Sequence, residues 1–186
     1  FEKVGGAFLK LGQIMSLQID LLPKEYCDAL LSLLDRVPTS SREEIAGVFV
    51  AEFGQRPEQL YAEFDYEAIG SASIGQVHRA RMAGGTAVAV KVRRPGVLQM
   101  FHRDTLLLQS FVRLIFLLRI RHLYFARDLV REQVTWTRDE LDYRREASHC
   151  DLVGRNAIDS ATERVPKVFW ELTTSRILTM EYLEGY

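Results

Sequence analysis

The run Val88-Ala89-Val90-Lys91 constrains this chain more than any other segment, because it places a lysine within an apolar strand-like sequence. Val88 and Val90 alternate with Ala89 and Lys91, which is the two-residue period of a β-strand. An ammonium group inside an apolar strand is unfavourable unless an anion pairs with it. The lysine therefore predicts a nearby carboxylate or bound anion, although the segment alone also fits a strand whose lysine faces solvent.

The segment before that strand has the small-residue pattern of a loop that covers nucleotide phosphates. It reads Gly70-Ser71-Ala72-Ser73-Ile74-Gly75-Gln76-Val77, with Ala72 where such loops carry a central glycine. Glycine allows the close approach of backbone amides, so the Ala72 methyl is expected to hold the loop further off or to alter the phosphate pose. Small residues in a hairpin are also ordinary turn chemistry. The following lysine strand, which differs from the Val-Ala-Ile-Lys pattern of kinases only at its third position, favours nucleotide binding.

The apolar periodicity orders the chain as helices, a hairpin, more helices and a second hairpin. Residues 1–64 are predicted to be helical, with a capping box at Ser41–Glu44 and a short helix from Pro57 through Phe64. Hairpins are predicted over residues 70–93 and 165–183, with helices over 98–154 between them. This order predicts an α+β fold, in which an N-terminal helical extension (1–64) precedes a lobe with an antiparallel sheet and a long helical insertion (65–186).

Composition narrows the function classes. The chain has 24 basic and 25 acidic residues, and this balance gives no electrostatic basis for binding nucleic acid. Its two cysteines cannot build a disulfide framework, which favours a reducing compartment. The four histidines lack metal-ligand spacing, so no metal site is predicted. The most apolar stretch, Leu106 to Ile120, is too short to cross a bilayer comfortably and predicts a buried or interfacial helix.

The spacing leaves open which carboxylate pairs with Lys91. About forty residues of helical, apolar sequence separate the lysine from the first acidic candidate, whereas in an ordinary kinase the pairing helix follows closely. The candidates are Glu132, Glu140, Asp142 and Glu146.

The last predicted strand, Ile177 to Leu183, corresponds to the place where a kinase chain leaves its first lobe and its backbone binds adenine. An ordinary apolar strand fits this segment as well. In the nucleotide interpretation, the side chains and backbone around the base belong to Ala89, Met180, Glu181 and Leu183.

Several further motifs occur in the order found in one family of kinase-like proteins. The chain resembles the UbiB family, the aarF-domain-containing kinase-like proteins linked to coenzyme Q. The matching segments are Lys10-Leu11-Gly12-Gln13, Gly70 to Gln76, Glu140-Leu141-Asp142, Arg145-Glu146-Ala147 and Val165-Pro166-Lys167-Val168. Gly70 and Ser71 stand where the family commonly has two alanines, which leaves the choice between ATP and ADP open.

The resemblance implies a kinase-like N-lobe whose nucleotide, ATP or ADP, is held by Lys91 and oriented through Glu140 or Glu146. It also implies that Lys10, Gly12 and Gln13 lie over the cleft, face Glu140 and Asp142 and inhibit ordinary protein phosphorylation. The C-lobe, with its catalytic Asp and Mg²⁺ ligands, would follow Tyr186. On this interpretation the chain is a piece of a longer protein, and it is expected to have no catalytic activity by itself.

The family's biology implies an atypical kinase or ATPase that supports isoprenoid-quinone synthesis at a bacterial or organellar inner membrane. Expected partners are quinone precursors, quinone-synthesis enzymes and an anionic membrane surface, which the arginines around Leu106–Ile120 would face. The alternative is a non-catalytic, kinase-shaped scaffold that binds lipid precursors or partner enzymes. A purely helical interaction protein is a third reading.

Overall fold

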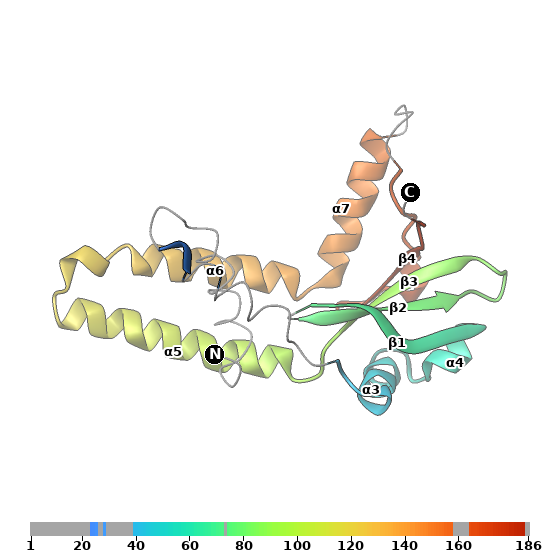
Figure 1. Cartoon of the computed structure of the whole chain (residues 1–186), viewed down its shortest axis with the longest axis horizontal. Coiled ribbons are helices and arrows are strands. Elements are labelled where there is room, and N and C mark those ends of the chain that lie inside the picture. The colour runs from blue at the N-terminus through green and yellow to red at the C-terminus, as the bar shows by residue number, and fades with distance from the viewer. Residues whose placement is uncertain (1–22, 26–27, 29–38, 73, 158–163, 185–186) are drawn as a thin grey trace. The chain divides into compact units, whose positions relative to one another are not determined.

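The computed structural model describes residues 23–25, 28, 39–72, 74–157 and 164–184 (Figure 1). Their contacts divide the chain into two compact units. One unit contains Thr39–Pro95 and Glu140–Tyr186, and the other includes Gly96–Asp139. Each unit is described by itself below.

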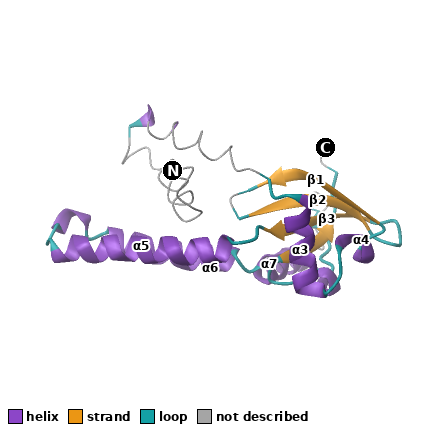
Figure 2. Ribbon diagram, turned by 90° about the horizontal axis from the view of Figure 1, so that it is seen from below, coloured by secondary structure: helices purple, strands orange, loops and turns teal. Residues whose placement is uncertain are grey.

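The first unit is built on a four-stranded antiparallel sheet. Its strands are β1 (Glu63–Ser71), β2 (Gly75–Arg81), β3 (Ala87–Arg93) and β4 (Ile177–Glu181), and they lie in the order β1-β2-β3-β4. The predicted α+β class with an antiparallel sheet is confirmed, and Figure 2 shows helices packed beside the strands. The predicted helix through Phe64 is wrong, because α4 spans only Pro57–Leu60 and β1 begins at Glu63. Alternation of Phe64 and Tyr66 with charged neighbours gives this segment the period of a strand.

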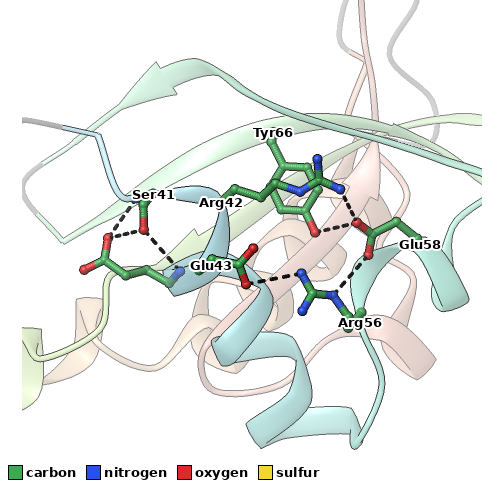
Figure 3. A network of polar contacts seen from close by, with 7 residues as sticks. Ser41, Arg42, Glu43, Arg56, Glu58 and Tyr66 are labelled. Carbon is green, nitrogen blue, oxygen red and sulfur yellow. Dashed lines mark hydrogen bonds and ion pairs between the residues drawn. The ribbon is translucent and has the colours of Figure 1, made fainter.

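The predicted capping box starts helix α3 (Arg42–Phe53). The Ser41 hydroxyl accepts a bond from the Glu44 backbone N–H, and the Ser41 N–H donates to the Glu44 carboxylate at 2.8 Å. Gly54 ends the helix with a φ of 70°, a backbone region that favours glycine. Figure 3 shows the charged side chains that tie α3 to α4 and β1, including the Arg42–Glu58 pair at 2.9 Å.

The core of this unit lies between α3 and one face of the sheet. Ile45, Val48 and Phe49 of α3 pack with three fully buried valines of β3, at positions 88, 90 and 92. Helix α7 (Tyr143–Asn156) packs with β4 in a second cluster, which joins Tyr143 and Ala147 to Leu178 and Val168. Helices therefore pack on both faces of the sheet, and β3 presents its even-numbered residues to α3.

The predicted strand over residues 165–172 is wrong for most of its length. Val168 makes an isolated antiparallel bridge to Met180, and Trp170–Leu172 form a short 3-10 helix, η3. Pro166 has no N–H to contribute to a ladder, and the Trp170 indole donates to the Asp151 carboxylate on α7 at 2.8 Å. These two features take the segment out of the sheet after a single bridge.

The second unit contains two long helices, α5 (Val97–Leu117) and α6 (Ala126–Glu140), which run side by side in Figure 1. A short 3-10 helix, η2 (Arg121–Leu123), lies between them. The helical pattern predicted over 98–154 is thus interrupted twice, after Leu117 and again at Leu141-Asp142 before α7. Within the part of the chain that the structure describes, no helix is long and apolar enough to span a membrane.

A buried chain of hydrogen bonds runs through the core face of the sheet. The Ser40 N–H donates to Gln76 Oε1 at 2.7 Å, and Gln76 Nε2 lies 2.9 Å from His78 Nε2. Because the Gln76 amide then donates, His78 Nε2 accepts and His78 Nδ1 donates to the Asp65 carbonyl at 2.9 Å. His78 is fully buried, and this desolvation lowers its pKa below the ordinary value of 6.5.

This network predicts that the fold loses stability in mild acid. Below about pH 6.5 the unfolded chain takes up a proton on His78 more readily than the folded chain, so the free energy of unfolding falls as the pH falls, by at most about 1.4 kcal/mol per pH unit, until the folded chain is protonated as well. Urea unfolding of the wild type and of His78→Gln between about pH 7 and 5 measures the effect. The variant is expected to show the shallower pH dependence, and equal slopes would contradict the assignment.

Candidate functional site

Lys91 of β3 binds the carboxylate of Glu146 in the first turn of α7. Its ammonium group lies 2.8 Å from Glu146 Oε1 and 2.7 Å from Oε2. Of the four acidic residues that the spacing left open, Glu146 is the one that pairs with the lysine. The Lys91 side chain remains 22% exposed, so solvent or a ligand can still reach it.

The strand register places several of the predicted nucleotide-binding residues on one face of the sheet. Val77 and Leu178 lie directly opposite Lys91 on the neighbouring strands, and opposite residues in antiparallel strands point to the same face. Gly70 pairs with Val77, and Met180 pairs with Ala89. This face is the one that α7 partly covers, and it is the opposite of the core face beneath α3.

Two predicted side chains have other partners. Gln76 lies opposite Val92, and its side chain is buried in the hydrogen-bond chain with Ser40 and His78. The Glu181 carboxylate binds Arg164 at 2.6 Å, and its backbone N–H donates to the Lys167 carbonyl. Leu183 follows the end of β4 and is half-buried. Any contact of Gln76 with a nucleotide would therefore involve its backbone.

An arginine that the sequence reading missed braces the loop between β1 and β2. Arg94, directly after β3, donates from its side chain to the Ala72 carbonyl at 3.1 Å and to the Ser71 hydroxyl at 2.5 Å. Its backbone N–H donates to the Ile74 carbonyl, and the Ala72 N–H donates to the Gly75 carbonyl at 2.8 Å. Ser73 lies outside the described residues. Burial lowers the pKa of the Arg94 guanidinium, which remains a cation at neutral pH.

Neighbouring atoms leave no room for a side chain at Gly75. A Cβ atom at this position would lie 2.2 Å from the Tyr143 hydroxyl oxygen and 2.8 Å from the Val92 carbonyl oxygen. Gly70, at the other side of the loop, has no atom within 4 Å of such a Cβ. The two glycines of the motif therefore differ, and only Gly75 is held by close packing.

The remaining predicted site residues lie beside α7 or outside the described part. Asp142 caps α7, where its carboxylate accepts a bond from the Arg144 N–H at 3.1 Å. Glu140 is exposed at the end of α6. Lys10, Gly12 and Gln13 lie outside the described residues, so their predicted position opposite Glu140 and Asp142 stays a prediction.

The four-stranded antiparallel sheet, a lysine on its third strand and a helix glutamate bound to that lysine define a kinase-like N-lobe. The model of the ABC1 atypical kinase-like domain matches residues 32–186, and the chain belongs to this family. The resemblance to the UbiB and aarF-type proteins is thereby confirmed.

Individual relatives agree with this assignment. The chain is 37% identical over 186 residues to the chloroplastic protein ACTIVITY OF BC1 COMPLEX KINASE 8 of Arabidopsis thaliana, covering 98% of this chain and 24% of that protein. It is 35% identical to a probable protein kinase UbiB of Azotobacter vinelandii, covering 99% of this chain and 34% of the relative. The chain therefore spans about a quarter to a third of the length of these relatives.

A solved structure supports the fold. The complex of Rv3197 with erythromycin from Mycobacterium tuberculosis matches with a TM-score of 0.65 and 26% identity, over 98% of this chain and 46% of that one. The two relatives above come from a chloroplast and a bacterium, which indicates an organellar or bacterial setting.

The packing at Gly75 yields a matched pair of substitutions. Gly75→Ala is expected to lower the free energy of unfolding by about 2–3 kcal/mol, because the methyl group must displace the Tyr143 hydroxyl and a backbone carbonyl. Gly70→Ala, in open space, is expected to change it by less than about 0.5 kcal/mol. Urea unfolding of both variants measures the difference, and equal losses would contradict the packing argument.

Proposed function

We propose that this chain is the nucleotide-binding lobe of an atypical kinase or ATPase, with Lys91 as the residue that holds the phosphates. The observation that carries the proposal is the two-oxygen contact between Lys91 and Glu146 on the sheet face below the β1–β2 loop. In kinases this lysine–glutamate pair directs the ammonium group to the nucleotide phosphates. The 22% of the Lys91 side chain that stays exposed lets one cation serve both the carboxylate and a polyphosphate.

The loop is proposed to cover those phosphates with its backbone. Arg94 holds the Ala72 carbonyl, and this fixes the loop from the side of β3. The Ala72 methyl is proposed to influence the choice between ATP and ADP, because it sets the distance between the loop backbone and the phosphates. The adenine base is proposed to lie on the same face of the sheet as Lys91. There it would contact Ala89, Met180 and the backbone of β4 and of the residues that follow it.

Bound ATP would supply the phosphoryl group, and Mg²⁺ would balance its charge. Among the residues that the structure describes, no group of three acidic, histidine or cysteine side chains could hold a metal ion. We propose that the Mg²⁺ ligands and the catalytic Asp follow Tyr186, and that this chain by itself binds nucleotide without turnover. Self-inhibition by Lys10 and Gln13 over Glu140 and Asp142 stays part of the proposal.

Nucleotide binding is tested on the full-length protein. At about 100 times its dissociation constant, ATP or ADP is expected to stabilise the wild type by about 2.7 kcal/mol, which raises the melting temperature by several degrees. Lys91→Ala is expected to abolish this shift and Glu146→Gln to reduce it. Lys167→Ala removes an exposed lysine of the same unit and should keep it. No shift in the wild type would refute the proposal.

A second candidate function, binding of a lipid precursor, is favoured by a groove in the unit of α5 and α6. The groove has a volume of about 520 Å³. Val112, Phe116, Val130 and Val134 give it an apolar lining, and Gln109 and Thr135 lie beside them. Among its described lining residues three are arginines, at positions 113, 127 and 131, and none is acidic.

The chemistry of the groove suits an amphiphile with an apolar tail and an anionic head. We propose that the ligand is an isoprenoid-quinone precursor, because its apolar tail matches the valine-rich lining and its benzoate head matches the arginines. The name of the UbiB relative agrees with a role in quinone synthesis. We propose that the protein lies in a reducing compartment at a bacterial or organellar inner membrane, which would supply such a molecule. The proposed partners are the anionic surface of that membrane and the enzymes of quinone synthesis.

Lipid binding is tested with a prenylated hydroxybenzoate in non-ionic detergent. Arg131→Ala and Arg113→Ala are each expected to weaken binding about fivefold, which corresponds to about 1 kcal/mol for one basic group near an anion. Arg138→Ala removes the same charge from an exposed position on α6 outside the groove. Equal losses in all three variants would show a general charge effect and contradict the groove.

A further inference from the structure

Tyr143 contacts both halves of the proposed nucleotide site. It is fully buried in the first turn of α7, three residues before Glu146. Lys91 Nζ lies 4.8 Å from the centre of the Tyr143 ring, within the range of a favourable contact between a cation and an aromatic face. The lysine thus contacts both a carboxylate and an aromatic ring, and both come from the first turn of α7.

The hydroxyl end of the same side chain lies against the phosphate loop. The Gly75 Cβ position would be 2.2 Å from the Tyr143 oxygen, so the hydroxyl occupies the space that a side chain at residue 75 would need. Gly75 is the residue at which the loop enters β2. One rigid ring therefore spans the distance from the lysine to the end of the loop.

This hydroxyl acts through its volume. Among the described residues the buried Tyr143 oxygen has no hydrogen-bond partner, whereas the hydroxyl of Tyr61, which is buried on the α3 side, lies 2.7 Å from the Thr179 hydroxyl. Removal of the Tyr143 oxygen therefore breaks no hydrogen bond to the described part of the chain. Tyr143→Phe keeps the ring beside Lys91, and Tyr143→Leu removes it.

We propose that Tyr143 is a positioning residue of the nucleotide site, which fixes the Lys91 ammonium group and the Gly75 end of the loop relative to each other. This inference rests on the proposed nucleotide binding and adds a residue that the glycine and lysine motifs do not contain. The ring limits the rotamers of the lysine, and the hydroxyl sets how closely the loop end approaches α7. The lysine and the loop then move as one body, and phosphate affinity depends on a side chain that is itself fully buried.

The first measurement is ATP affinity of the full-length protein. Tyr143→Leu is expected to weaken binding about fivefold to tenfold through loss of the ring below Lys91. Tyr143→Phe keeps the ring and loses only the hydroxyl contact with the loop end, so it is expected to weaken binding about twofold to threefold, less than Tyr143→Leu. Phe49→Leu removes a buried ring from the core on the opposite face of the sheet, so it should lower the melting temperature and leave affinity within about twofold. An equal loss of affinity in Phe49→Leu and Tyr143→Leu would overturn the inference.

The second measurement needs no nucleotide. Gly75→Ala is combined with Tyr143→Phe, and the urea midpoint is compared with those of the two single variants. Because the phenyl ring lacks the oxygen at 2.2 Å, the alanine should lower the midpoint less in the Tyr143→Phe background, with some loss left from the Val92 carbonyl at 2.8 Å. Equal losses in both backgrounds would overturn the contact.

The two measurements separate this inference from the proposed function. No ATP binding by the wild type, with the Gly75–Tyr143 coupling intact, overturns the proposed nucleotide site and with it the role of Tyr143. ATP binding that is unaffected by Tyr143→Leu overturns the positioning role alone.

Discussion

The pairing of Lys91 with Glu146 is the interaction on which the arrangement of the sheet-containing unit depends. A lysine opposite Val77 and Leu178 lies in an apolar setting, and its charge is stabilised there because two carboxylate oxygens lie within 2.8 Å. The carboxylate belongs to a helix 55 residues further along the chain. Helix α7 must therefore return to the strand that carries the lysine, and the chain between them forms α5 and α6, which belong largely to a separate unit.

The long insertion is compatible with this pairing for a simple entropic reason. The free-energy cost of closing a loop grows only with the logarithm of its length, by about 0.6 kcal/mol per doubling. Contacts on α7 other than the ion pair also hold the helix in place. Tyr143 donates its backbone N–H to the Ser175 carbonyl, and the Trp170 indole donates to Asp151. The insertion can thus have its own groove without loosening the lysine–glutamate contact.

Local signals predicted the parts of the fold that local chemistry decides. The capping box at Ser41–Glu44, the turn before β3 and the strand that ends near Lys91 all depend on neighbours in sequence, and the structure has them. The start of β1 at Glu63 differs from the prediction, because the aromatic alternation there is short enough to fit the end of a helix as well. The segment after Val165 has strand-like alternation, but it pairs with β4 only around Val168 and then turns into a short 3-10 helix, where the Trp170 indole binds α7.

The site residues that the sequence could predict are likewise those that belong to local motifs. The loop and the lysine were visible as motifs, and the register places Gly70, Val77 and Ala89 on the lysine's face. The choice of Glu146 among four acids depends on how α7 packs, which no spacing rule contains. Tyr143 and Arg94 were missed for the same reason, since an aromatic residue in a helix and an arginine after a strand carry no motif.

The strict alternation of β3 has a consequence for how the sequence of this lobe can change. Its even positions fit beneath α3 and its odd positions face α7, so the side-chain period of two leaves the strand only one workable frame. Deleting one residue between Val88 and Lys91 would carry the ammonium group into the aromatic layer around Phe49 and bring a valine to the place opposite Glu146. Changes of length are therefore confined to the turn at residues 82–86 and to the segments beyond the strand, while β3 itself admits substitutions only.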